Sequence, residues 1–455
     1  MFETLENKVG SRLILPSNEK YDETRKVWNG AVNRKPGAIV VCESTDDVIA
    51  AVKFAKKNDL TISIRGGGHH VAGTAVCDDG VMIDLSKMRK VRVDNVKKLA
   101  YVQGGALLQD IDKETQKYDL AVPTGTVSET GVAGLALNGG LGYLRGKYGL
   151  TCDNLAGAKL ITAEGELLEV NENNHPDLFW AIRGGGGNFG VVTEFQFQLH
   201  EVGPEVLALD VMYDYKDAKE VILKAQEFMS DAPDEISINI TATTLPPAPF
   251  LPEFLHMKKV VIITGMYAGN PQAGEELIQP LRELAEPIID GTSVISYVEL
   301  QSKLDIMVEN HIPVYGTSLY FKELTEETVD TLLSKIDSAP APSVLVQLWS
   351  LHGQMNRIPS DATAFAMRDA SCVLLVDMMA MHVPEELCKK WVDSVYSSLL
   401  ERSHKNASYL NAIEPDKDVI KATHGKNHDR LVEVKTKYDP DNRLCHNHNI
   451  APTRK

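Results

Sequence analysis

The sequence contains no long apolar run. Its longest apolar stretch, Cys372 to Val383, is interrupted by Asp377 and His382, whereas a membrane-spanning helix requires roughly 18 apolar residues. The first residues, MFETLENKVGSR, carry acids where a secretory signal has basic residues, and no apolar segment follows them. We therefore expect no membrane partner and a cytoplasmic location.

Cysteine and positive charge are also scarce. The 455 residues include 6 cysteines without any Cys-x-x-Cys pair, so neither a zinc site nor a disulfide framework is expected. Lys and Arg number 47 against 63 Asp and Glu, which gives a net charge of −16. That sign opposes binding to a phosphate backbone, so nucleic acid is not an expected partner. The His- and Asn-rich end, Cys445–Asn449, lacks further groups that would complete a metal site.

Glycine is abundant but unevenly placed. Of the 33 glycines, 22 fall between Gly66 and Gly190. Glycine lets backbone N–H groups approach a ligand without a Cβ in the way. The concentration therefore indicates one cofactor that is contacted along several loops.

The chain is about three times the length typical of one domain, so we expect at least two structural units. Up to about residue 203, short elements of both kinds follow one another between glycine turns. We expect strands at 38–44, 61–65, 80–86, 90–95, 99–105 and 191–199, a hairpin at 158–170, and helices at 45–60 (with Thr45 as its cap), 107–120 and 175–183. Beyond 203 glycine becomes sparse and strands such as 257–268 alternate with helices such as 273–286, which predicts a second domain over about 204–410.

The first motif, RGGGHHVAG, runs from Arg65 to Gly73 directly after a predicted strand. Three consecutive glycines expose successive N–H groups as an anion-binding concavity, and an adjacent arginine can add hydrogen bonds to a diphosphate. A glycine-rich surface turn would explain an isolated run of this kind. The other glycine loops favour the ligand-binding interpretation.

Two further glycine motifs exclude other nucleotide sites. Within 124–154, the spacing from Gly142 to Lys147 is one residue short of a phosphate loop, and Tyr148 replaces the metal-binding Ser or Thr. Around Gly185–Gly190 the order is helix, glycines, strand, whereas the dinucleotide fingerprint needs strand, glycines, helix. A nucleoside triphosphatase is rejected, and a nicotinamide-dependent dehydrogenase is a weak alternative.

The order of the motifs RGGGHHVAG, SETGVAGLALNGGLGYLRGKYGLTCDNL, DLFWAIRGGGGNFGVVTEF and VKTKYDPDNRLCHNHNI resembles the flavin-linked oxidases of the vanillyl-alcohol oxidase (PCMH-type) superfamily, in their berberine-bridge-enzyme-like branch. The resemblance implies an α+β fold with a two-part FAD-binding domain. An inserted substrate domain would hold an antiparallel sheet covered by helices. The implied boundaries are 1–203, 204–410 and a tail, 411–455, that returns to the FAD domain.

The resemblance implies that His69, and not His70, is bonded covalently to FAD. Many relatives have a second link through a cysteine, whose position here is Val127, so a single link is expected. The implied FAD contacts are Arg65, Gly66, Gly67, Gly68, His69, His70, Gly73, Ser128, Thr130, Gly131, Gly134, Gly140, Gly142, Asp153, Asn154, Gly187, Gly190, Val192, Asn447 and Asn449.

The implied reaction removes a hydride from a C–H bond next to an alcohol or amine of a small molecule, with O2 as the second substrate. Relatives often have a tyrosine base where this chain has Ala412. Tyr409 and Asn411 share one face if their segment is a strand, so they are the candidate catalytic pair. Tyr409 could equally be a packing residue. Further pocket candidates on strand-like segments are Tyr315, Tyr320, His352 and Arg368. A flavin-binding structural or coat-like protein with little turnover is the alternative function.

Overall fold

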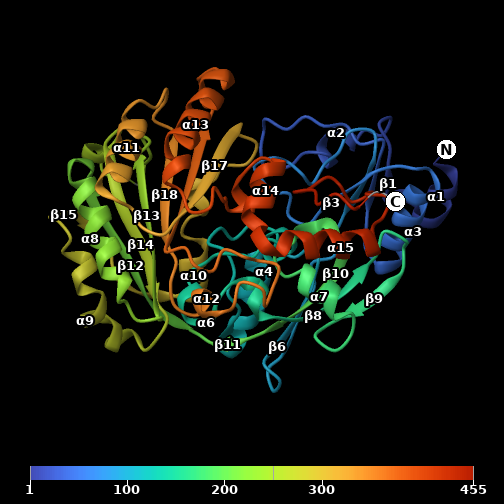
Figure 1. Cartoon of the computed structure of the whole chain (residues 1–455), viewed down its shortest axis with the longest axis horizontal. Helices are drawn as coiled ribbons and strands as arrows, with labels where there is room; N and C mark the ends of the chain where they lie inside the picture. Colours follow the sequence, from blue (N-terminus) through green and yellow to red (C-terminus); the bar gives the residue numbers. More distant parts are fainter. Residues whose placement is uncertain (1, 250, 454–455) are drawn as a thin grey trace.

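The computed structural model describes residues 2–249 and 251–453. Figure 1 shows two bodies side by side, one built around a large sheet with helices on its outer side and the other containing several small sheets. The N- and C-termini both lie in the second body (Figure 1). Residues far apart in the sequence therefore meet there.

The first small sheet holds the strand that precedes the RGGGHH motif. Its order is β1 (Leu13–Ile14), β2 (Ala38–Val41), β4 (Val81–Asp84) and β3 (Ile62–Arg65), with β2, β4 and β3 parallel. Helix α3 (Thr45–Lys57) packs against it, and α1 (Glu3–Val9) packs on α3. The predicted cap, Thr45, is wrong by one residue. Ser44 is the cap because its hydroxyl accepts from the N–H of Asp47, whose carboxylate accepts from the N–H of Ser44.

A second small sheet is antiparallel throughout. Its order is β5 (Val91–Asp94), β6 (Leu99–Gln103), β10 (Val191–Gln198), β8 (Leu155–Ile161) and β9 (Leu167–Val170). A short pair, β7 (Leu120–Ala121) and β11 (His200–Glu201), lies apart from it. The core of the five-stranded sheet is shared with helices from both ends of the chain: α4 (Leu108–Thr115), α5 (Val132–Leu137), α7 (Pro176–Ala181), α14 (Lys417–His424) and α15 (His428–Tyr438).

The large sheet is formed by residues 205–379. Its order is β15 (Pro287–Asp290), β12 (Glu205–Asp214), β14 (Lys259–Tyr267), β13 (Ile236–Thr244), β18 (Val344–Ser350), β19 (Cys372–Met379) and β17 (Val314–Phe321), and β16 (Ser293–Ser296) also pairs with β12. Every pairing is antiparallel. The prediction of an α+β fold with an antiparallel sheet in the inserted region is confirmed.

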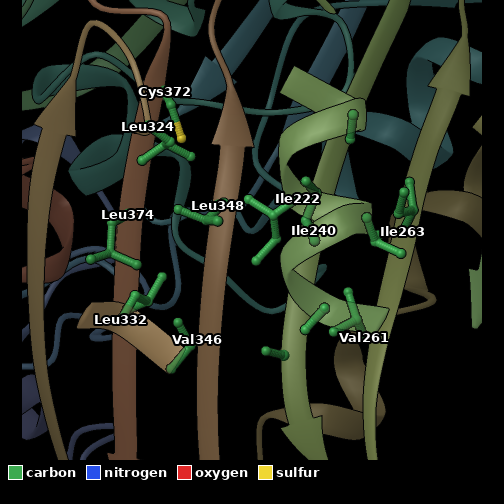
Figure 2. Packing of buried hydrophobic residues seen from close by; sticks show 14 of the residues in the cluster. Ile222, Ile240, Val261, Ile263, Leu324, Leu332, Val346, Leu348, Cys372 and Leu374 are labelled. Atoms are coloured by element: carbon green, nitrogen blue, oxygen red, sulfur yellow. The ribbon is translucent and has the colours of Figure 1, made fainter. Parts of the chain in front are cut away.

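Four long helices cover one face of the large sheet. They are α8 (Ala218–Ser230), α9 (Pro271–Arg282), α11 (Glu326–Asp337) and α13 (Glu385–Leu399). Figure 2 shows Ile222 of α8 packed over strand residues such as Ile240 and Leu348. Because side chains alternate along a strand, the residues between these point to the opposite face, toward the second body. Two short helices, α10 (Tyr297–Ser302) and α6 (Arg145–Tyr148), lie at the junction of the two bodies.

Two segments predicted as strands are not strands. Residues 410–412 form a 3₁₀ turn, because the hydroxyl of Ser318 binds both the N–H and the C=O of Tyr409, and Ala412 N–H then closes onto Tyr409 O. Residues 363–370 have no regular structure, since Arg368 turns back to a buried carboxylate of the other body. His352 lies beyond the end of β18.

One buried ion pair joins the tail to the glycine-rich region. Lys435 on α15 and Asp439 are both fully buried, with 2.7 Å between Nζ and Oδ2. The ammonium also donates to the carbonyls of Asn188 and Leu444, at 2.9 and 3.0 Å. All three of its protons thus have protein acceptors.

Two further buried cations join the two bodies. Arg145 donates to Gly142 O and Ser350 O, at 2.9 and 2.6 Å. Arg368 forms a two-pronged ion pair with Asp153, at 2.6 and 2.8 Å. The tail helices share a core with the five-stranded sheet. In the sequence, the strands of the large sheet lie between that sheet and the tail. We therefore propose domain boundaries near 203 and 410.

Replacing Lys435 by Met should lower the free energy of unfolding by about 3–5 kcal/mol, because Asp439 then stays buried without a cation. The double change Lys435→Met with Asp439→Leu should recover much of that loss. Lys437→Met on the same helix is the control, since its exposed pair with Asp177 is worth less than about 1 kcal/mol. Denaturant unfolding measures all three. An equal loss for Lys435 and Lys437 would contradict this role of burial.

Candidate active site

A cavity of about 430 Å³ lies between the two bodies. One wall consists of the glycine motifs and the tail, and the other is the face of the large sheet opposite its four long helices, together with residues 303–304 and 306–308. The elongated lining reaches from Ile62 on β3 to Asp377 on β19. Both the predicted cofactor loops and the inserted region therefore open onto one space.

The glycine wall begins with residues 66–70, directly after β3. Within the described part of the chain, none of their five backbone N–H groups donates to a protein acceptor. Successive free N–H groups form a concavity that binds anions. This loop has the donors that a diphosphate requires.

Other glycines contribute open space to the cavity. A Cβ added to Gly134 or Gly187 would meet no protein atom within 4 Å, and both residues line the cavity. A Cβ on Gly67 would instead lie 2.4 Å from the backbone nitrogen of Gly131, so the first and second motifs touch through their backbones. The loops are packed against each other and open toward the cavity.

His69 is held flat against an aromatic ring. Its imidazole stacks on Trp28, with ring centroids 4.6 Å apart and an angle of 18° between the planes. Burial lowers the pKa of His69 to about 4, so the ring is neutral near pH 7 and keeps one unprotonated nitrogen. The sequence analysis did not identify Trp28, because nothing local in the sequence marks its contact with a residue 41 positions away.

His70 points to the other side of the loop. Its Nε2 donates to Leu410 O at 2.9 Å, and its Nδ1 accepts from the N–H of Ala72. His448 of the tail binds the same carbonyl. Burial lowers the pKa of His448 to about 3 and that of nearby His424 to about 4. His70 and His448 thus meet at the carbonyl of Leu410, which joins the first glycine loop to the tail.

The tail also supplies polar atoms to the cavity region. Asn447 lines the cavity and donates its amide to Leu444 O at 3.0 Å. Within residues 2–249 and 251–453, the side-chain oxygens of Asn447, Asn449 and Asn138 are buried without a hydrogen-bond partner. Unpaired buried acceptors in one region are what a missing donor-bearing ligand leaves behind.

Most residues predicted to act in the site line this cavity: Gly66, Gly67, Gly68, His69, His70, Thr130, Gly131, Gly134, Gly187, Gly190, Val192, Asn447, Tyr409 and Asn411. The others do not line it: Arg65, Gly73, Ser128, Gly140, Gly142, Asp153, Asn154 and Asn449. Several of these have protein partners. Arg65 pairs with Asp84, and Ser128 binds Asp305 through its N–H and hydroxyl.

The four additional pocket candidates lie outside the cavity lining. Tyr315 faces α13, where its hydroxyl bonds Glu385, and Tyr320 is fully buried. His352 packs against Gly146, and Arg368 pairs with Asp153. The strand register, which cannot be read from one strand alone, turns Tyr315 toward the helices. Tyr320 lies on the opposite face, where it packs in a core with Trp349 and Tyr409 instead of lining the cavity.

The sheet wall of the cavity comes from residues that the sequence analysis did not identify. Neighbouring strands contribute them in register: Asp210 opposite Thr264, Thr241 opposite Gln347, and Leu345 opposite Asp377. Asp210 pairs with Lys303 at 2.5 Å. Only the pairing of strands shows which of their residues share this face.

Tyr409 and Asn411 meet in the cavity wall although their segment is not a strand. The Tyr409 oxygen accepts from Asn411 Nδ2 at 3.0 Å and from the N–H of Leu141 at 3.2 Å. Burial raises the pKa of Tyr409 to about 12, so the phenol keeps its proton near pH 7. A phenol in this state can donate a hydrogen bond to a ligand.

Known proteins share these features. A family of FAD binding domains matches residues 36–171, and the family described as berberine and berberine like matches residues 408–451. An FAD-linked oxidoreductase of Dictyostelium discoideum is 32% identical over 96% of this chain and 93% of its own. The (R)-6-hydroxynicotine oxidase of Paenarthrobacter nicotinovorans is 31% identical over 98% and 97%.

Solved structures agree on the fold. The 6-hydroxy-D-nicotine oxidase of Arthrobacter nicotinovorans superposes with a TM-score of 0.86 at 28% identity over 98% of both chains. A chitooligosaccharide oxidase superposes at 0.85 with 23% identity, over 99% of this chain and all of its own. The chain is thus a flavin-linked oxidoreductase. It belongs to the berberine-bridge-like branch of the PCMH-type FAD oxidases.

The residues present fit FAD. The free N–H groups of 66–70, the open space at Gly134 and Gly187 and the unpaired oxygens of Asn138 and Asn447 lie along one cavity. Within the described residues, no cluster of three or more metal-binding side chains occurs, and no helix is long and apolar enough to cross a bilayer.

The buried histidines should make the protein unstable in acid. Their folded pKa values lie below the ordinary value of about 6.5, so the unfolded chain takes up protons that the folded chain cannot. The contribution of these neutral histidines to the free energy of unfolding is fully present above about pH 6.5, and it is lost as the pH drops toward 4. His448→Gln keeps a donor for Leu410 O and should reduce the slope by about 1.4 kcal/mol per pH unit.

Chemical denaturation between pH 4 and 7 measures that slope, with His382→Gln as the control because His382 is exposed. If His448→Gln and the wild type lose stability equally over this window, neutral burial of His448 is not a source of the acid sensitivity.

Proposed function

We propose that this protein is an FAD-dependent oxidoreductase whose flavin is covalently bound to His69. It transfers a hydride from a C–H bond next to an alcohol or amine of a small molecule to flavin N5. Oxygen then reoxidises the flavin and yields hydrogen peroxide. The observation that carries the proposal is the position of His69, a neutral imidazole on the loop whose five N–H groups are free in the cavity wall.

The stacking of His69 on Trp28 supports the covalent link. The contact limits rotation of the imidazole, and its neutral state leaves a nitrogen lone pair for bond formation. Val127, at the position of the second link in doubly linked relatives, lines the same cavity without a nucleophilic atom. Both observations support a single link through His69.

The residues around the cavity would divide the work of binding and proton transfer. Bound FAD supplies the hydride acceptor. The N–H groups of residues 66–70 would hold its diphosphate, and Asn447 would lie beside its ring system. Tyr409, held by Asn411, donates a hydrogen bond to the substrate heteroatom, since a pKa of about 12 makes it a poor base.

Asp377 is better suited to accept a proton. It lines the cavity, and burial raises its pKa to about 6, so its carboxylate is ionised at pH 7. A general base works best when its pKa lies near the operating pH. A substrate that arrives already deprotonated would need no base.

Acid denaturation of the purified protein should leave flavin on the wild-type chain and release it from His69→Ala. His70→Gln is the matched control, because it keeps a donor for Leu410 O, and it should retain the flavin. Mass and absorbance of the precipitated chain measure attachment. Flavin retained by His69→Ala would require another attachment residue and would contradict the single link.

The same preparation separates catalysis from mere binding of flavin. Screening small amines and alcohols for bleaching of the bound flavin, and for peroxide in air, tests turnover. A flavin that no donor reduces would favour a non-catalytic, coat-like role. A colourless protein that responds to NAD(P) would favour the nicotinamide alternative.

A further inference from the structure

The cavity contains two carboxylates, and only one of them is paired with a cation. Asp210 on β12 is neutralised by Lys303, at 2.5 Å. Asp377 on β19 has no ion pair and no side-chain hydrogen bond with any of the described residues. Asp377 is half-buried and faces the cavity, and a ligand that displaced its water without offering a partner would bind at a cost. Asp377 is therefore an acceptor that the protein itself leaves unmatched.

The neighbours of Asp377 carry no charge. Gly316 on β17 and Leu345 on β18 pair with it across the strands, and Leu375 precedes it on the same face. The turn over residues 410–412 brings Ala412 O near Gly316. The charged or titratable groups elsewhere in the cavity are Lys303, which is paired with Asp210, and His69, His70, Tyr409 and His446.

The space beside the carboxylate is kept open by a glycine. A Cβ on Gly316 would lie 2.7 Å from Asp377 Oδ1 and would force it to move. The walls on either side, Leu345 and Leu375, are apolar. A group that fits here carries a positive charge on a compact, partly apolar body.

We propose that Asp377 is the counter-ion of a cationic amine, so that the substrates of this enzyme are small amines rather than neutral alcohols or sugars. The inference deepens the proposed function and rests on it. A bound ammonium gives the unmatched carboxylate a partner, and a neutral alcohol does not. Asp377 would then accept one N–H proton of the ammonium, which gives the neutral amine from which a hydride can leave. The apolar walls hold the alkyl or aryl part of the amine.

A pair of probes of the same shape tests this charge preference. Benzyltrimethylammonium carries a fixed positive charge, and neopentylbenzene is its neutral counterpart. Perturbation of the flavin absorbance and the shift in thermal unfolding report binding without turnover. The wild type should bind the cation, and Asp377→Asn should bind it roughly tenfold or more weakly, as expected for loss of a buried charge partner.

Asp377→Glu keeps the charge and should bind the cation more tightly than Asp377→Asn does. Asp337→Asn removes one negative charge from an exposed pair with Lys259 and should bind it like the wild type. Neopentylbenzene should bind Asp377→Asn at least as well as the wild type. Equal affinity of the wild type and Asp377→Asn for the cation, or an equal loss for both probes, would overturn the proposal.

The pH dependence gives a second readout. Affinity for the fixed cation should fall as the pH drops through about 6, because protonation removes the charge of Asp377, and Asp377→Asn should show no such fall. A flat profile in the wild type would contradict the assignment.

The failure of this inference is distinguishable from the failure of the proposed function. A protein that holds flavin through acid denaturation but ignores the cation refutes the amine specificity alone. A protein without flavin refutes the proposed function, whatever the probes do.

Discussion

The buried ion pair between Lys435 and Asp439 is the interaction on which the cavity depends. A charge without access to water requires a complete set of partners, and Lys435 takes them from Asp439, Asn188 and Leu444. Asn188 in turn binds His448 O and the N–H of Ile450. The glycine turn and the tail are thereby fixed to one another, which places Asn447 in the cavity wall.

Arg145 and Arg368 are buried cations that bond acceptors on both sides of the junction between the two bodies. Arg145 is fully buried, and this burial lowers its pKa to about 9. Its acceptors lie on Gly142 of one body and on Ser350 and Ile238 of the other. A relative movement of the two bodies would leave a buried guanidinium group without its acceptors, which is costly. The sheet face and the glycine wall therefore keep a fixed separation.

The continuous motifs could be predicted from the sequence, whereas the opposite wall of the cavity could not. Residues 66–70 act through backbone N–H groups, so their order along the chain already carries the signal. Asp377 and Asp210 share a face only through strand pairings that span more than a hundred residues. Trp28 reaches His69 in the same long-range way. The strand expected at 409–412 failed because the Ser318 hydroxyl takes up the backbone groups of Tyr409.

The two walls of the cavity have opposite electrostatic character. The glycine wall presents free N–H groups, whose partial positive charges suit a diphosphate. The sheet wall presents the carboxylate of Asp377, which suits a cation. Burial acts on both sides but in opposite directions, since it lowers the pKa of His69 and raises that of Asp377. Near pH 7 it leaves a neutral imidazole where the flavin would attach and an ionised carboxylate where an amine would bind, so a single pH range serves both ligands.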